Sequence, residues 1–256
     1  TIMNQFNRGR FLSLSVSTYC DAPAGSGLGS SSTLVVAMVR AYVELLNLPL
    51  DDYSIANLAY KIERLDCGLQ GGRQDQFSAT FGGVNFIEFH RHPRTTVNPL
   101  RVKNWILCEL EASLVLYFTG VSRESARIIA EQSGNVHENK NDALNAMHSV
   151  KREALIMKEC LLKGDFDGFV MAMRRGWAAK KQSASTVSNS NIDAVYEAAM
   201  EAGALAGKVS GAGGGGFMWF FVPNEKRMNV CRTLESFGGQ AGNCHFTKSG
   251  CQAWRP

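Results

Sequence analysis

Long apolar runs are missing from this sequence. The longest candidates, residues 112–118 and 217–222, have the length of a strand, whereas a membrane-spanning helix needs about 18 or more consecutive apolar residues. The N-terminus also lacks the charged and apolar regions of a secretory signal peptide. We therefore expect a protein that neither crosses nor binds a membrane.

Disulfide and metal-ligand patterns are missing as well. The seven cysteines are odd in number and include no Cys-x-x-Cys pair, which argues against a disulfide scaffold and against a zinc site. The five histidines show no metal-ligand spacing, and we interpret His90 and His92, beside Pro93, as part of a solvent-exposed turn. The pattern predicts reduced thiols and a cytoplasmic location.

A strong excess of one charge is missing too. Charged residues make up 20% of the chain, an ordinary share for a globular protein, and the net charge is +4. Since no basic stripe is present, nucleic acid is not an expected partner, while the mild positive charge suits an acidic small molecule. The 256 residues, 45% of them hydrophobic, can bury the core of one large or two modest domains.

Two common nucleotide-binding motifs are also absent. The P-loop pattern G-x-x-x-x-G-K-[ST] does not occur, because the nearest approach, residues 203–208, is followed by Val209. Gly211 to Gly216 satisfy G-x-G-x-x-G, but we expect a helix before them and a strand after them, which is the reverse of the Rossmann order. The stretch is interpreted as a glycine wall for a phosphate or a loop, or as a tight backbone crossing in the core.

What the sequence does contain is a stretch of small residues, Pro23-Ala24-Gly25-Ser26-Gly27-Leu28-Gly29-Ser30-Ser31-Ser32, between a predicted strand at 11–18 and a predicted helix at 33–48. Glycines leave backbone N–H groups uncovered, and a helix N-terminus adds partial positive charge, so this turn suits an anion. The serine hydroxyls could cap the helix, touch phosphate oxygens or ligate Mg²⁺. A flexible linker is the alternative, but the flanks favour a nucleoside triphosphate site.

Two carboxylates follow at separate turns. Asp75 lies between a second glycine-rich stretch and a short helix, where it could accept a proton from a substrate hydroxyl while Arg73 steadies developing charge. The alternative is a helix N-cap. Glu63 falls on the last turn of a predicted helix at 53–65, where it could ligate Mg²⁺ beside a triphosphate. Its alternative is a solvated helix face shared with Arg64.

The rest of the pattern predicts a mixed α+β chain with a shift in composition near Glu109. We place a domain boundary there, dividing residues 1–108 from residues 109–256. The further elements that we expect are a strand at 84–89, a connection at 98–105, a strand at 112–118, a mainly helical region from 122 to about 182, a helix at 192–202, a strand at 217–222 and a helix at 225–237.

Taken together, these motifs resemble those of the GHMP kinase superfamily. The resemblance is carried by Pro23 to Ser32, Glu63, Gly71 to Asp75 and Lys208 to Gly216, in this order and spacing. Within the superfamily, residues 71–76, 117–123 and 208–216 are similar to the D-glycero-D-manno-heptose 7-phosphate kinases. The likeness runs from about Cys20 to the end of the chain.

The resemblance implies a fold and a reaction. The fold would be the α+β GHMP kinase fold, with an incomplete ribosomal-protein-S5-like N-terminal domain, a ferredoxin-like C-terminal domain and the active site between them. The reaction would be in-line transfer of the γ-phosphoryl group of ATP to O1 of heptose 7-phosphate, which gives the 1,7-bisphosphate for nucleotide-activated heptose. A kinase for an unphosphorylated sugar such as fucose and a catalytically silent nucleotide-binding protein are the alternatives.

The resemblance also implies residue roles. The stretch from Pro23 to Ser32 would bind ATP, Ser31 and Glu63 would ligate Mg²⁺, and Asp75 with Arg73 would be catalytic. Cationic groups for the sugar phosphate are expected at Arg123 and at Lys180-Lys181, with ordinary surface charge as the alternative. The full set of expected substrate-binding residues is Gly71, Gly72, Thr119, Arg123, Lys180, Gly211, Ala212, Gly213 and Gly214.

The front of the chain departs from the family pattern. Kinases of this family open with a strand and a substrate-binding segment rich in Arg and Gly, which are not found before Cys20. We therefore expect that the sequence is part of a longer chain and assign no residues to that part of the adenine and sugar pockets. A homodimer is compatible with this interpretation, and no membrane or nucleic-acid partner is expected.

Overall fold

The computed structural model describes residues 1–22, 25–91, 94–120, 125–138 and 141–255. They form two compact units: the first contains residues 1–24, 29–99 and 247–256, and the second contains residues 25–28 and 100–246. The small-residue stretch is therefore divided, with Gly25 to Leu28 in the second unit and Gly29 onward in the first. The expected boundary after residue 108 lies inside helix α5 (Asn104–Ser113).

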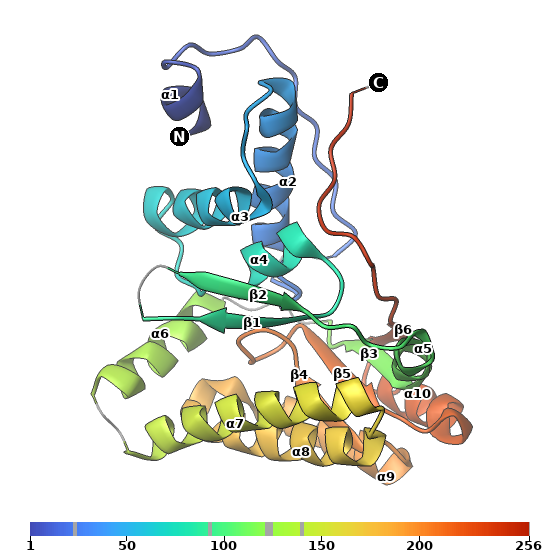
Figure 1. Ribbon diagram of the computed structural model, residues 1–256. Helices are drawn as coiled ribbons and strands as arrows, with labels where there is room; N and C mark the ends of the chain where they lie inside the picture. The colour runs from blue at the N-terminus through green and yellow to red at the C-terminus, as the bar shows by residue number, and fades with distance from the viewer. Residues whose placement is uncertain (23–24, 92–93, 121–124, 139–140, 256) are drawn as a thin grey trace. The chain divides into compact units, whose positions relative to one another are not determined.

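The first unit is built from helices and a β-hairpin (Figure 1). Its elements are α1 (Ile2–Phe6), α2 (Ser30–Leu45), α3 (Asp52–Tyr60), the π-helical turn η1 (Lys61–Asp66), α4 (Gln74–Phe81), β1 (Asn85–Phe89) and β2 (Thr95–Pro99). The Asp51 side chain caps α3 by accepting a hydrogen bond from Ser54 N at 2.8 Å. The strands β1 and β2 pair antiparallel, with Ile87 opposite Val97.

Two small apolar clusters hold this unit together. Val36 and Val39 of α2 pack against Ile55 and Leu58 of α3, as the three- and four-residue spacing of these residues requires. The buried Phe77 of α4 belongs to a second cluster, with Ala56 and Val97. Helix α4 is thereby fixed on both α3 and the hairpin.

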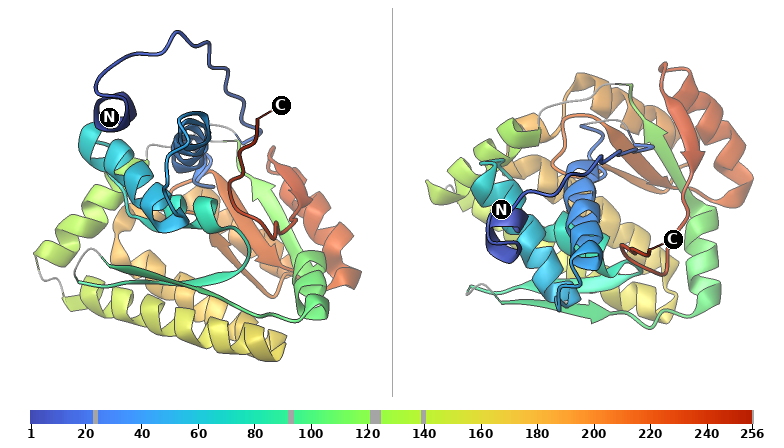
Figure 2. Two further views of the ribbon diagram at one scale, coloured as in Figure 1. Left: turned by 45° about the horizontal axis from the view of Figure 1, so that its top comes forward. Right: turned by 90° about the horizontal axis from the view of Figure 1, so that it is seen from above.

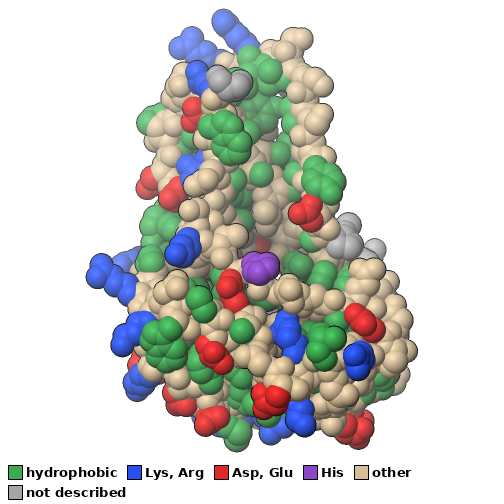
Figure 3. Space-filling view, turned by 90° about the vertical axis from the view of Figure 1, so that its right-hand side faces the viewer, with side chains coloured by type: hydrophobic (Ala, Val, Ile, Leu, Met, Phe, Trp, Pro, Cys, Tyr) green, Lys and Arg blue, Asp and Glu red, His purple; other side chains and the backbone are tan. Residues whose placement is uncertain are grey.

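The strand predicted at residues 11–18 is wrong. Residues 10–20 are not part of any strand in the structure, because no described strand pairs with them, and an extended segment becomes a strand only through such pairing. This segment and the C-terminal residues 250–255 run along α2 (Figure 2). They border a pocket of about 630 Å³ lined by Val16, Leu34, Met38 and Trp254 among others, which is the hollow in the upper half of Figure 3.

The second unit is a four-stranded antiparallel sheet with helices. Its elements are α5, β3 (Leu114–Phe118), α6 (Ser125–His137), α7 (Asn141–Lys163), α8 (Phe166–Ser183), η2 (Ser185–Val187), α9 (Ser190–Ala202), β4 (Ala206–Val209), β5 (Phe217–Phe221), η3 (Asn224–Lys226), α10 (Arg227–Glu235) and β6 (Gln240–Asn243). The strand order is β4-β5-β3-β6. The helical region predicted from 122 to 182 is confirmed by α6, α7 and α8, whereas β2 and α5 were not predicted.

The two faces of this sheet differ. Tyr117 of β3 and Met218 and Phe220 of β5 lie in one buried cluster with residues of α9 and α10. On the other face, the Phe221 ring meets Phe169 of α8, with ring centroids 6.3 Å apart. Among the helices that the structure describes, none combines the length and the apolar character needed to cross a bilayer.

The glycine wall is the turn between β4 and β5. The helix expected immediately before it is therefore wrong, since Lys208 and Val209 belong to a strand. A strand also follows, so the Rossmann pattern stays excluded. The wall packs on the small-residue stretch, because Phe217 N donates to Ser26 O at 2.8 Å and Ser210 Oγ donates to Gly27 O at 3.0 Å.

Replacing Gly216 by alanine tests this packing. Gly216 has a φ of 80°, and an added Cβ would lie 2.2 Å from Ser26 O. We expect Gly216→Ala to lower the free energy of unfolding by at least about 2 kcal/mol, because a left-handed backbone already costs about 1–2 kcal/mol and the clash adds to it. Urea denaturation followed by tryptophan fluorescence measures the change.

Gly242→Ala is the matched control for this prediction. Gly242 lies in β6, where an added Cβ would meet no atom within 4 Å. This variant should unfold within about 0.5 kcal/mol of the parent. Equal stability of the two variants would contradict the close backbone approach.

Candidate active site

The first turn of α2 carries the three serines of the small-residue stretch. Gly29 is the N-cap, with a φ of 73° and without a side-chain cap, so the helix begins with uncovered backbone N–H groups. Ser31 Oγ donates to Glu63 Oε1 at 2.8 Å, and Ser32 Oγ donates to Glu63 Oε2 at 2.7 Å. The helix N-terminus and a carboxylate are therefore joined by hydroxyl groups.

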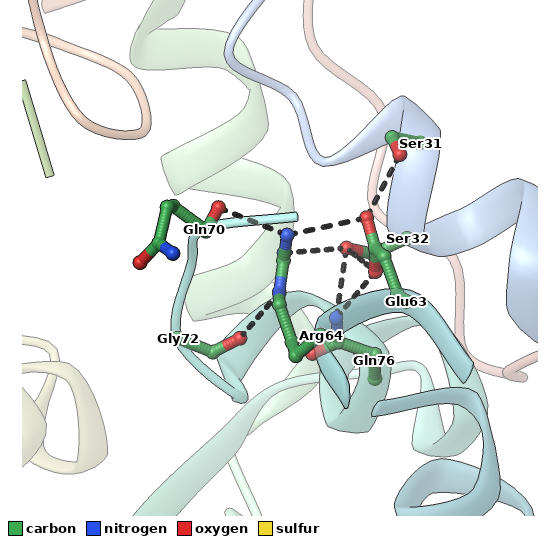
Figure 4. A network of polar contacts seen from close by, with 7 residues as sticks. All are labelled: Ser31, Ser32, Glu63, Arg64, Gln70, Gly72 and Gln76. Carbon is green, nitrogen blue, oxygen red and sulfur yellow. Dashed lines mark hydrogen bonds and ion pairs between the residues drawn. The ribbon is translucent and has the colours of Figure 1, made fainter. Parts of the chain in front are cut away.

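Glu63 is the centre of a polar network (Figure 4). Its side chain is only 2% exposed, so the alternative of a solvated helix face is wrong. Besides the two serines, Gln76 Nε2 donates to Glu63 Oε2 at 2.6 Å, and Arg64 Nη1 lies 3.5 Å from Glu63 Oε1. A buried carboxylate is stable only with such partners.

Gln76 and Arg64 are members of this network that were not assigned from the sequence. Gln76 is fully buried and also donates to Ser32 Oγ at 3.0 Å. The only signal for Gln76 was its place directly after Asp75 in the glycine-rich motif, and Arg64 was considered only as a surface partner of Glu63. Long polar side chains are mostly found on surfaces, which is why neither residue stood out.

Asp75 lies in the first turn of α4, beside the start of α2. The N-cap of α4 is Arg73, and it has no side-chain cap bond, so the N-cap alternative for Asp75 is wrong. A Cβ added at Gly29 would lie 2.9 Å from Asp75 Cγ, which shows how closely the carboxylate approaches the glycine. Burial raises the pKa of Asp75, the Arg64 guanidinium opposes this rise, and the Glu63 carboxylate adds to it.

Arg73 is not brought to this carboxylate by any described contact. Its guanidinium carbon lies 4.7 Å from the centre of the Tyr60 ring, a cation–π arrangement. The cation that influences Asp75 is Arg64. Gly71 and Gly72 form the turn before α4, and Gly72 O accepts a hydrogen bond from Arg64 Nε at 3.4 Å.

In the second unit, the remaining part of the small-residue stretch lies on the glycine wall. Ser26 is fully buried, and its hydroxyl oxygen has no hydrogen-bond partner among the described residues. Thr119 is anchored on the wall, because its backbone N and its Oγ1 each donate to Gly216 O at 3.0 Å. Gly214 N donates to Val187 O at 2.8 Å, so this part of the wall fits the alternative of a tight backbone crossing.

Lys180, at the end of α8, reaches the same wall. Its ammonium group donates to Gly211 O. Burial lowers the pKa of Lys180 to about 7, and the positive charge of Lys208 contributes. Burial also lowers the pKa of Lys208, whose Nζ lies 5.4 Å from the centre of the Trp219 ring. Two partly desolvated cations thus occur near the wall.

The remaining residues that were expected in the site differ in where the structure places them. Pro23, Ala24 and Arg123 lie outside the described residues. Leu28 is 42% exposed, and Ala212 packs at the edge of the large cluster of the second unit. In the described part of the chain, no three His, Cys, Asp or Glu side chains gather as a metal site, so any cation would need ligands beyond the carboxylates.

Comparison with known proteins identifies two family domains in this chain. The model for the GHMP kinases N terminal domain matches residues 2–83, and the model for the GHMP kinases C terminal domain matches residues 157–239. The D-glycero-alpha-D-manno-heptose 7-phosphate kinase of Campylobacter jejuni is 49% identical over 244 residues, which cover 95% of this chain and 71% of that protein.

Two solved structures extend the comparison. A proposed sugar kinase from Campylobacter jejuni aligns with a TM-score of 0.80 and 46% identity over 100% of this chain and 73% of that chain. A D-glycero-D-manno-heptose 1-phosphate kinase from Bacteroides thetaiotaomicron aligns with a TM-score of 0.75 and 41% identity over 93% of this chain and 66% of that chain. With both domains matched in order at this level of identity, the chain belongs to the GHMP kinases.

Proposed function

We propose that the protein is an ATP-dependent kinase that phosphorylates O1 of D-glycero-D-manno-heptose 7-phosphate. The observation that carries this proposal is the buried Glu63 carboxylate, which is held by two serines of the α2 N-terminus. Asp75, the candidate base, lies against Gly29 at the start of the same helix. The combination suits a charged phosphate substrate and a hydroxyl group that must lose a proton.

The small-residue stretch and the start of α2 provide groups that suit the phosphates of ATP. Gly25 and Gly27 have φ values of 72° and 79°, a conformation that leaves backbone N–H groups free to face an anion. The unpartnered hydroxyl of Ser26 is a donor that bound phosphate oxygens could satisfy. The uncapped start of α2 adds the favourable field of a helix N-terminus.

The residues present also fit Mg²⁺. Ser31 and Glu63 would hold the ion, since hydroxyl and carboxylate oxygens are the hard donors that it prefers. Such a small protein donor set is typical of Mg²⁺ sites in which phosphates and water complete the shell. When bound, the ion supplies charge neutralisation for the phosphate oxygens.

Asp75 is the group that we assign to the acceptor hydroxyl. As the O1–H oxygen forms its bond to the γ-phosphorus of ATP, the bond from that phosphorus to the β–γ bridging oxygen breaks and ADP leaves. The proton of O1–H passes to the Asp75 carboxylate. Its pKa, raised by burial, makes it a better base than an exposed aspartate.

Lys180 is the group that we assign to the phosphate already on the sugar. The names of two relatives place that phosphate at opposite ends of the heptose, on O7 in one and on O1 in the other. We propose the 7-phosphate as the substrate because the relative with this name has the higher identity, 49% against 41%.

The free thiols of all seven cysteines support a reducing, cytoplasmic location for the protein.

The role of Asp75 is tested by Asp75→Asn. We expect kcat to fall by about 10²- to 10⁴-fold, which is the usual contribution of a general base, while ADP binding stays within about threefold. A coupled ADP-release assay over heptose 7-phosphate, heptose 1-phosphate and fucose measures turnover and acceptor choice. Asp142→Asn, an exposed carboxylate in the first turn of α7, is the control.

The outcome that would contradict this prediction is a turnover number unaffected by Asp75→Asn. A parent enzyme that prefers fucose or the 1-phosphate would instead overturn the proposed substrate and leave the role of Asp75 standing.

The role of Glu63 is tested by Glu63→Gln. We expect the Mg²⁺ concentration for half-maximal activity to rise by at least about 10- to 100-fold, because loss of a residue that only supports a metal ligand already has effects of this size. Binding of Mn²⁺ in the presence of ADP, followed by electron paramagnetic resonance, gives a readout that does not need turnover. Glu88→Gln changes an exposed carboxylate of the same unit and should leave both measurements unchanged. An unaltered Mn²⁺ affinity in Glu63→Gln would remove Glu63 from the metal site.

The role of Lys180 is tested by proton uptake. With a pKa of about 7, its amine is about nine-tenths deprotonated at pH 8. A phosphate dianion favours the charged form, so binding of sugar 7-phosphate at pH 8 should take up nearly one proton. Isothermal titration calorimetry in two buffers of different ionisation enthalpy measures the number of protons.

Matched lysine variants complete this test. Lys180→Met should abolish the proton uptake, whereas Lys181→Met, which removes an ion pair with Asp193 at 3.2 Å, should preserve it. Proton uptake that accompanies ADP instead of the sugar phosphate would assign Lys180 to the nucleotide.

A further inference from the structure

The Arg64 side chain links the Glu63 network to the turn before α4 (Figure 4). Its Nη1 donates to Gln70 O at 3.0 Å, and its Nε donates to Gly72 O at 3.4 Å. Its Nη2 donates to Ser32 Oγ at 3.3 Å. One planar guanidinium therefore contacts two carbonyls of the turn and one hydroxyl of α2.

The turn is closely fitted to this guanidinium. A Cβ added at Gly71 would lie 2.3 Å from Arg64 Cζ, so the backbone passes directly beside the group. The Arg64 side chain is only 13% exposed. A desolvated arginine whose fork matches two carbonyl groups is poorly replaced by lysine, which presents a single ammonium group.

A plain ion pair with Glu63 does not account for this arrangement. The closest atoms of that pair are 3.5 Å apart, whereas the serine and glutamine donors lie 2.6 to 2.8 Å from the carboxylate oxygens. Glu63 is thus satisfied mainly by other residues. The hydrogen bonds of Arg64 go chiefly to the backbone of the turn.

The turn determines where α4 begins. Residues 67–73 join η1 to α4, and the first turn of α4 carries Asp75 and Gln76. Gln76 in turn contacts Glu63. Movement of the turn would therefore move the candidate base and one support of the candidate metal ligand together.

We propose that Arg64 is a positioning residue, which fastens the turn at residues 68–73 so that Asp75 and Glu63 keep their mutual placement. This inference rests on the proposed function for its catalytic consequence, but its structural part concerns the free protein. The positive charge of Arg64 also opposes the rise in the pKa of Asp75.

Hydrogen exchange in the free protein tests the structural part. In Arg64→Met, the Leu69 amide, which donates to Glu63 O at 3.1 Å, should exchange at least about tenfold faster than in the parent, because the turn that carries it opens more often once its carbonyls lose the guanidinium. Arg40→Met is the matched control. It removes a partly buried arginine of the same unit that pairs with Asp52 and should leave exchange in the turn unchanged.

Kinetics test the catalytic part. Arg64→Met should lower kcat by about 10²-fold, the size of effect that misplacement by about 1 Å produces, with KM for ATP within about threefold. Arg64→Lys, which keeps the charge without the fork, should recover less than about a tenth of the loss. The Arg40→Met control should keep the parent kcat.

Three outcomes would overturn the inference. They are unchanged exchange in the turn of Arg64→Met, full recovery of kcat in Arg64→Lys, and an equal loss of kcat in Arg40→Met. Absence of kinase turnover in the parent would refute the proposed function and the catalytic part, while the exchange experiment would still decide whether Arg64 fastens the turn.

Discussion

The desolvated carboxylate of Glu63 is the constraint on which the first unit depends. Because its side chain is 2% exposed, every element around it must supply a hydrogen bond or a positive charge. Helix α2 supplies two serine hydroxyls, α4 supplies the Gln76 amide, and η1 supplies Arg64. The start of α2 is thereby joined to η1 and α4, which lie 31 to 44 residues further along the chain, and the candidate Mg²⁺ ligands Ser31 and Glu63 are members of this network.

In the second unit the constraint is steric, because two backbone segments lie too close together for side chains between them. Its glycine wall and the residues Gly25 to Leu28 approach so closely that side chains cannot be accommodated, as the contact of Gly216 with Ser26 O shows. Backbone packed on backbone leaves the Ser26 hydroxyl buried, without a hydrogen-bond partner among the described residues. Polar groups of this kind can recognise phosphate without carrying a charge, while Lys180 adds a charge that depends on pH.

The sequence predicted the features that depend on local order. Helix α2, which begins three residues ahead of its predicted start, the strand β5 and the places of Asp75 and Glu63 in the sequence follow from turn residues and from apolar spacing. Features that depend on distant partners were missed. Residues 11–18 alternate as a strand does, but pairing decides their state, and β4 is a four-residue strand containing a glycine. The burial of Gln76 and Arg64 follows from Glu63, and no local pattern encodes it.

The π-helical turn η1 has a consequence for insertions and deletions. Each residue of a regular α-helix turns the chain by about 100°, so removing a single residue, such as Lys61, would rotate everything upstream relative to Glu63. The shortened segment could form a more regular helix, yet its carboxylate would no longer face Ser31 and Ser32. Wide helical turns of this type often occur at functional sites. Here two successive residues of the turn, Glu63 and Arg64, both contact the Ser32 hydroxyl, so a change of helical register at this point would alter both contacts at once.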